Sequence, residues 1–153
     1  MAIVSMDEIK NFLGIEDQYF KITAGNDVLV LTSSEGGPRS IDVPDGTYNG
    51  TTLASALQTA MNADTTLTGG SITFAVSYSS STEKFTIDAT VGETIAYTHS
   101  GSDAGYTFGF DADHDAAQTI TSNNPAGDPT DIVSNIKGAI EDYVQNVYCK
   151  RIF

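Results

Sequence analysis

The sequence has few of the residues from which zinc sites and disulfides are built, and no long apolar run. Its 153 residues include one cysteine, no tryptophan and two histidines. The single Cys149 cannot form an intramolecular disulfide, and it excludes a cysteine-based zinc site. No run of 18 apolar residues occurs, and residues 1–10 do not resemble a signal peptide. We therefore expect a soluble protein that is made in a cytosol.

Basic residues are also scarce. Seven lysines and arginines stand against 20 aspartates and glutamates, which gives a formal net charge of −13. A field of this sign repels phosphate groups and anionic lipid surfaces, so we expect neither sequence-specific nucleic-acid binding nor membrane binding. Apolar residues make up 40% of the chain. That share is sufficient for a folded core, so wholesale disorder is excluded.

Motifs for catalysis are missing as well. The chain has no Gly-x-Ser-x-Gly element, and its glycine pairs lack the lysine of a phosphate-binding loop. His99, Ser100 and Asp103 are neighbours in sequence, which is not how hydrolytic triads are assembled. We therefore predict no enzymatic activity, no catalytic residues and no cofactor.

One acidic stretch admits two interpretations. Asp111, Asp113 and Asp115 alternate as the first ligands of a calcium loop do. Ala116 stands where an EF-hand needs glycine, and Ser122 stands where it needs glutamate, so an EF-hand is excluded. The stretch is then either a looser calcium site or a solvated acidic loop, and no residue is assigned as a metal ligand.

The two ends of the chain have helical patterns. Ser5 and Glu8 form a capping box for a helix over residues 4–14. A second helix is predicted over residues 128–149, with Asp128 as its N-cap and Pro129 at its first position. The apolar residues of this second helix recur at spacings of three and four.

The middle of the chain reads differently. Strands are predicted over residues 27–32, 40–43, 71–78, 83–89 and 94–98, with a hairpin loop at 79–82. One helix is predicted over residues 51–63, with Asn49 as its N-cap, and a polar loop follows at 64–70. We interpret the many aromatic residues here as core or sheet-face residues; the alternative is a sugar-binding platform. The aromatic residues in question are Tyr19, Phe20, Tyr48, Tyr78, Phe85, Tyr97, Tyr106, Phe108 and Phe110.

The two ends together resemble the head–tail connector (adaptor) family of long-tailed bacteriophages. The family opens with a short helix, which residues 9–17 match, and continues with a longer one that ends near an arginine and a phenylalanine. The matching positions are Ile9, Phe12, Leu13, Ile15, Glu16, Asp17, Ile132, Ile136, Ala139, Ile140, Tyr143, Val144, Tyr148, Arg151 and Phe153. In this chain some 110 residues separate the two elements, whereas the family joins them more closely.

Residues 41–110 resemble a module of virus structural proteins, in which a strand and a Pro-x-Gly-x-Tyr turn precede a helix and a hairpin. The two likenesses together predict an α+β fold. Its terminal helices, residues 1–17 and 128–153, would pack together as the connector part. Residues 18–127 would form an inserted, mostly antiparallel β domain covered by one helix. Insertion costs little when the ends of the insert lie close together.

The resemblance implies a structural virion protein at the phage neck. It would form a homo-oligomeric ring, a dodecamer by the resemblance, between the portal protein and a stopper or tail-completion protein, after synthesis in the bacterial cytoplasm. The alternative is a tail-associated or decoration protein whose β-rich domain binds a host glycan or another virion protein.

The end of the chain combines two cations with aromatic and apolar residues. It is either a disordered tail or a docking arm that inserts into a partner. In the connector family this region contacts the portal ring, so the resemblance favours the arm. The portal-docking residues would then be Tyr148, Lys150, Arg151, Ile152 and Phe153.

Overall fold

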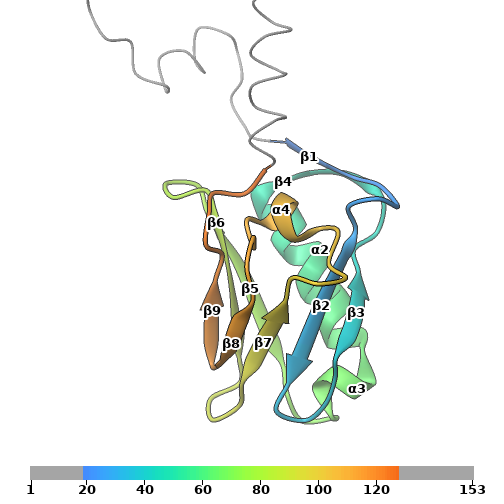
Figure 1. Ribbon diagram of the computed structural model, residues 1–153, viewed down its shortest axis with the longest axis vertical. Coiled ribbons are helices and arrows are strands. Elements are labelled where there is room, and N and C mark those ends of the chain that lie inside the picture. The colour runs from blue at the N-terminus through green and yellow to red at the C-terminus, as the bar shows by residue number, and fades with distance from the viewer. Residues whose placement is uncertain (1–18, 128–153) are drawn as a thin grey trace, which may run out of the picture.

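A computed structural model describes residues 19–127 as one body of strands and short helices (Figure 1); residues 1–18 and 128–153 lie outside the described residues. The strands are β1 (Tyr19–Ile22), β2 (Val28–Ser33), β3 (Arg39–Asp42), β4 (Gly46–Asn49), β5 (Phe74–Ser79), β6 (Lys84–Ala89), β7 (Ile95–Thr98), β8 (His114–Ala117) and β9 (Thr119–Thr121). The helices are α2 (Gly50–Ala63), α3 (Thr65–Thr68) and α4 (Gly105–Phe108).

The strands form three antiparallel sheets, with the orders β1-β4, β3-β2-β7-β8 and β5-β6-β9. Only Gln118 separates β8 from β9, yet β8 pairs with β7 and β9 pairs with β6. The Gln118 carbonyl accepts a hydrogen bond from the Ala89 amide, 2.8 Å away, so the ladder beside β6 continues through the junction. One short segment therefore joins the two larger sheets.

The core lies between these sheets and α2, which runs behind them in Figure 1 and packs mainly on β5. In β2 and β6 alternate side chains are buried, as expected for strands with one solvated face. From α2, Leu53, Leu57 and Met61 are fully buried in the same core. Their spacing of four residues places them on one face of the helix.

Asn49 begins α2 with a capping box. Its side chain accepts a hydrogen bond from the Thr52 amide at 2.9 Å, and its own amide donates to Thr52 Oγ1 at 3.0 Å. These bonds satisfy donors that a helix start otherwise leaves without partners. The prediction of a helix capped by Asn49 is confirmed, although the helix begins at Gly50.

The predicted α+β fold class, with terminal helices packing together, is wrong. Strands account for 38% of the described residues and helices for 20%, in three antiparallel sheets, and the described residues contain no packed terminal helices. Two of the three described helices have only four residues, which is too short to form a helical layer. Pairing between strands, rather than helix packing, organises the body. The helices predicted at residues 4–14 and 128–149 lie outside the described residues.

The five predicted strands and the hairpin are confirmed within a few residues. Several short elements escape prediction: β1, β4, β8, β9 and α4, as well as α3, which occupies the segment expected to be a polar loop. Three of these six elements, β4, β8 and β9, bury at most one side chain each, so they carry little of the alternation that identifies a strand.

Candidate functional site

The two ends of the described body lie at the same end of the molecule (Figure 1). Thr107 in α4 connects them: its Oγ1 accepts a hydrogen bond from Asn26 Nδ2 at 3.3 Å, and its carbonyl accepts one from the Gly127 amide at 3.0 Å. Asn26 Nδ2 also donates to the carbonyl of Lys21 in β1, 2.9 Å away. The first strand of the body, β1, and its last described residue, Gly127, are therefore both linked to α4 by hydrogen bonds.

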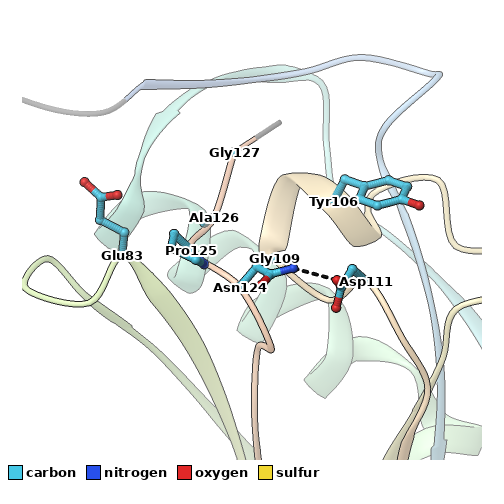
Figure 2. A pocket seen from close by; sticks show the side chains of 8 residues that line it. All are labelled: Glu83, Tyr106, Gly109, Asp111, Asn124, Pro125, Ala126 and Gly127. Atoms are coloured by element: carbon cyan, nitrogen blue, oxygen red, sulfur yellow. Dashed lines mark hydrogen bonds between the residues drawn. The ribbon is translucent and has the colours of Figure 1, made fainter. Parts of the chain in front are cut away.

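A pocket of about 530 Å³ opens at this end of the body (Figure 2). The turn between β5 and β6 contributes to its wall, as do α4, the segment after α4 and the final described residues. The lining residues are Glu83, Tyr106, Gly109, Asp111, Asn124, Pro125, Ala126 and Gly127. We call this the terminal pocket.

Gly109 allows the wall of the terminal pocket to close. It ends α4 in the left-handed conformation with φ of 79°, which glycine adopts without steric cost. Its carbonyl accepts a hydrogen bond from the Asn124 amide at 3.0 Å. A Cβ atom at this position would lie 2.2 Å from the Asn124 carbonyl oxygen, so no other residue fits without moving the strip from Asn124 to Gly127.

Asp111 and Asn124 form the polar pair of the terminal pocket. Asn124 Nδ2 donates to Asp111 Oδ2 at 2.6 Å, which orients the carboxylate (Figure 2). Both side chains are exposed. Lys84 lies beside the lining, and its ammonium donates to the Asn123 carbonyl at 2.7 Å.

Tyr106 presents an aromatic surface to the terminal pocket. Its side chain is 54% exposed, and its ring meets that of His99 edge to face, at a centroid distance of 5.3 Å and an angle of 84°. The sequence-based assignment to the core or a sheet face is wrong for Tyr106, which is exposed and lies in helix α4. Tyr19 is 68% exposed but lies in β1, so it is a sheet-face residue and not a core residue. No sequence signal separated these tyrosines from buried Tyr97.

Tyr97 lies in the core, where its ring contacts that of His99. It is buried, and its hydroxyl donates to the Phe110 carbonyl at 3.1 Å. Burial raises the pKa of this phenol because it disfavours the phenolate. The hydroxyl lies 3.4 Å from His99 Nδ1, so this tyrosine positions the His99 ring under Tyr106.

The structure does not assemble a triad from His99, Ser100 and Asp103. Asp103 Oδ1 accepts a hydrogen bond from the Val28 amide at 2.7 Å, which commits it to the start of β2. His99 uses its backbone amide to donate to Asp113 Oδ1 at 2.7 Å. The carboxylates of Asp103 and Asp113 therefore hold the backbone of neighbouring segments in place.

The acidic stretch likewise divides its carboxylates among different tasks. Asp111 faces Asn124, whereas Asp113 holds the His99 amide. Within residues 19–127, no group of three or more histidine, cysteine or acidic side chains is placed to hold a metal ion. Asp111 and Asp113 therefore have different hydrogen-bond partners.

The predicted portal-docking residues Tyr148, Lys150, Arg151, Ile152 and Phe153 all lie outside the described residues. Sequence reasoning missed the terminal pocket, because its lining comes from three segments that only the fold brings together. The one local signal is Gly109, which follows the short helical turn that ends at Phe108. A glycine in this position fits an ordinary loop equally well.

Comparison of the chain with protein-family models, with curated proteins and with solved structures found no match in any of the three. Within the described residues, no helix has the length and apolar character needed to cross a membrane.

Proposed function

We propose that this protein is a structural virion protein of a long-tailed phage, acting as a head–tail connector. The proposal begins from the resemblance of residues 1–17 and 128–153 to the connector family. It is supported by one structural observation: the described body begins and ends at the same end of the molecule, where Thr107 ties both segments. A body of this kind can be inserted between two flanking segments without holding them apart.

In this proposal the flanking segments make the ring and the body is its appendage. The ring would sit between the portal protein and a stopper or tail-completion protein, and the arm formed by residues 148–153 would dock to the portal. The described body carries 12 acidic and three basic residues, a net of −9. This charge keeps the surfaces of neighbouring bodies from adhering to one another.

Portal binding by the intact chain tests the proposal. The purified chain is mixed with the portal ring of the phage or prophage that encodes it, and the mass of the complex is measured by sedimentation velocity and electron microscopy. We expect a ring of this chain on the portal, and we expect that deleting residues 148–153 abolishes it. Phe153→Ala should weaken attachment at least tenfold, and Val91→Ala, at an exposed apolar position of the body, is the matched control. No attachment of the intact chain would overturn the proposal.

The alternative is a tail-associated or decoration protein that binds a glycan or another virion protein. Tyr106 favours it, because this exposed aromatic residue lines the same pocket as the Asp111–Asn124 pair, and sugar sites combine aromatic and planar polar groups. Retention of the intact chain on host cells, lost with Tyr106→Ala and accompanied by no attachment to the portal, would support this alternative.

A further inference from the structure

We infer that the terminal pocket holds the basic residues Lys150 and Arg151 of a second copy of this chain, which makes it the contact between neighbouring subunits. This inference rests on the proposed function, because it deepens the proposed ring. It concerns a different surface from the portal, however, and can fail separately.

The terminal pocket has the chemistry of a site for a guanidinium group. Asn124 uses Asp111 Oδ2, and within residues 19–127 no hydrogen bond involves Asp111 Oδ1. A guanidinium bound there would donate to a carboxylate that is already oriented, and charge-assisted bonds of this type are about twice as strong as neutral ones. Tyr106 also lines the pocket, and its side chain is 54% exposed, so its ring is accessible to a guanidinium.

The charges around the terminal pocket favour a cation. Glu83 also lines the pocket, and Figure 2 shows it across the strip of residues 124–127 from Asp111, so it adds negative charge around the site without joining the Asp111–Asn124 pair. Lys84 is the adjacent cation, and its ammonium already donates to the Asn123 carbonyl. The surrounding body has a net charge of −9, so a basic segment is attracted and an acidic one repelled.

The chain itself contains a matching occupant. It has two arginines, and Arg39 donates to Asp64 Oδ2 through Nε at 2.9 Å and Nη2 at 2.8 Å. Arg151 is the other, next to Lys150, and these are the only two adjacent basic residues in the sequence. Tyr148, Ile152 and Phe153 flank them and provide apolar surface for the pocket wall formed by Pro125 and Ala126.

Binding between different copies explains how a ring closes. A contact between an arm on one copy and a pocket on the next is head-to-tail, and such contacts generate rings when the rotation closes. Lys150 and Arg151 would be held by the neighbouring body, while Ile152 and Phe153 beyond them remain available for the portal. One arm would then set both the spacing of subunits and their attachment.

A peptide corresponding to residues 146–153 is the direct probe. It is titrated into the chain lacking residues 148–153, and binding is followed by calorimetry at low and high salt. We expect saturable binding that weakens as salt rises. Asp111→Arg and Tyr106→Leu should each weaken it at least tenfold. Asp115→Arg, an equal change of charge at an exposed acid outside the pocket, should leave affinity within about twofold. Absence of binding, or equal loss with Asp111→Arg and Asp115→Arg, overturns the inference.

Mixing two full-length variants distinguishes a second copy from the chain's own arm. Asp111→Arg destroys the pocket but keeps the arm, and Arg151→Asp destroys the arm but keeps the pocket. We expect neither variant to self-associate and their mixture to form a one-to-one heterodimer in sedimentation velocity. A mixture that stays monomeric overturns the assignment to a second copy. Peptide binding without attachment to the portal would leave this inference standing and the connector proposal refuted.

Discussion

Asp64 performs three tasks at the junction of two helices. Its amide donates to the Met61 carbonyl at the end of α2, and its Oδ1 accepts from the Thr66 and Leu67 amides at the start of α3. Its Oδ2 accepts from Arg39, which fastens the junction to β3. We expect Asp64→Ala to lower the free energy of unfolding by about 1 kcal/mol or more through the lost cap. Asp64→Asn should cost less, since an amide oxygen can still accept the cap bonds. Urea unfolding measures both changes, and equal losses would contradict this division of roles.

The pH dependence of stability provides a second test at Asp64. The hydrogen bond from Arg39 is the main cause of a lowered pKa for this carboxyl group in the folded protein. A carboxyl whose pKa is depressed by folding stabilises the fold above its unfolded pKa of about 3.9, and this contribution disappears as pH falls through the folded pKa. The stability gap between the wild type and Asp64→Asn should therefore be full at pH 7 and close below about pH 4. A gap that persists unchanged into acid would contradict the expectation.

At Gly50, the first residue of α2, the neighbouring ring of Tyr78 leaves no room for a side chain. A Cβ atom there would lie 2.1 Å from Cδ1 of Tyr78. Alanine is favoured over glycine in a helix by about 1 kcal/mol, but the overlap would force the ring aside at a cost of about 1–3 kcal/mol. We expect Gly50→Ala to be neutral or destabilising, whereas Thr51→Ala next to it should stay within about 0.5 kcal/mol of the wild type. Thermal unfolding compares them, and a clear gain in stability from Gly50→Ala would refute the packing argument.

At the scale of elements, α2 protects the outer edge of β5. Asn62 bonds Phe74 twice, since its Oδ1 accepts from the amide at 2.8 Å and its Nδ2 donates to the carbonyl at 2.9 Å. Gln58, one turn earlier, accepts from the Val76 amide at 2.9 Å. These amide side chains form hydrogen bonds with backbone groups of β5 that would otherwise be unpaired at the edge of the sheet. A strand of another chain can pair with such an unpaired edge.

Replacing Asn62 tests this edge protection. Asn62→Ala leaves both Phe74 groups without their partner, so we expect a loss of about 1–2 kcal/mol in urea unfolding. The double variant Gln58→Ala/Asn62→Ala should also aggregate faster in light scattering, because the exposed edge can pair with another chain. Thr59→Ala on the exposed side of α2 is the control. An Asn62 variant as stable as this control would show that the edge needs no such cover.

The elements that sequence reasoning found are those specified by neighbouring residues. The apolar stripe of α2 and its cap at Asn49 lie within one short segment, as do the two alternating strands of the β5–β6 hairpin. β1 and β4 pair across more than 20 residues, and β9 has Ile120 as its one buried residue. Such strands exist because a partner is already in place, which no local pattern encodes. The terminal pocket escaped prediction for the same reason.

At the scale of the whole molecule, the sequence indicated a separate body but not the layout of its ends. Composition distinguished the middle, which is rich in serine and threonine and poor in bases, from two flanks whose sequences have helical patterns. The convergence of both ends depends on Thr107, Asn26 and Gly127, polar residues with no pattern of their own. Their arrangement arises only once the sheets have formed.

A body whose ends converge and whose core is internal should fold by itself. Its buried residues come from nearly every described element, and 109 residues are enough for a stable core. We expect the fragment 19–127 to unfold cooperatively with a midpoint within a few degrees of the corresponding transition of the full chain, followed by circular dichroism. Leu57→Ala, at a fully buried position of α2, should destabilise fragment and full chain alike by about 2–5 kcal/mol. A fragment without a cooperative transition would mean that the flanking segments complete its core, and insertion of a ready-made domain would then no longer describe this chain.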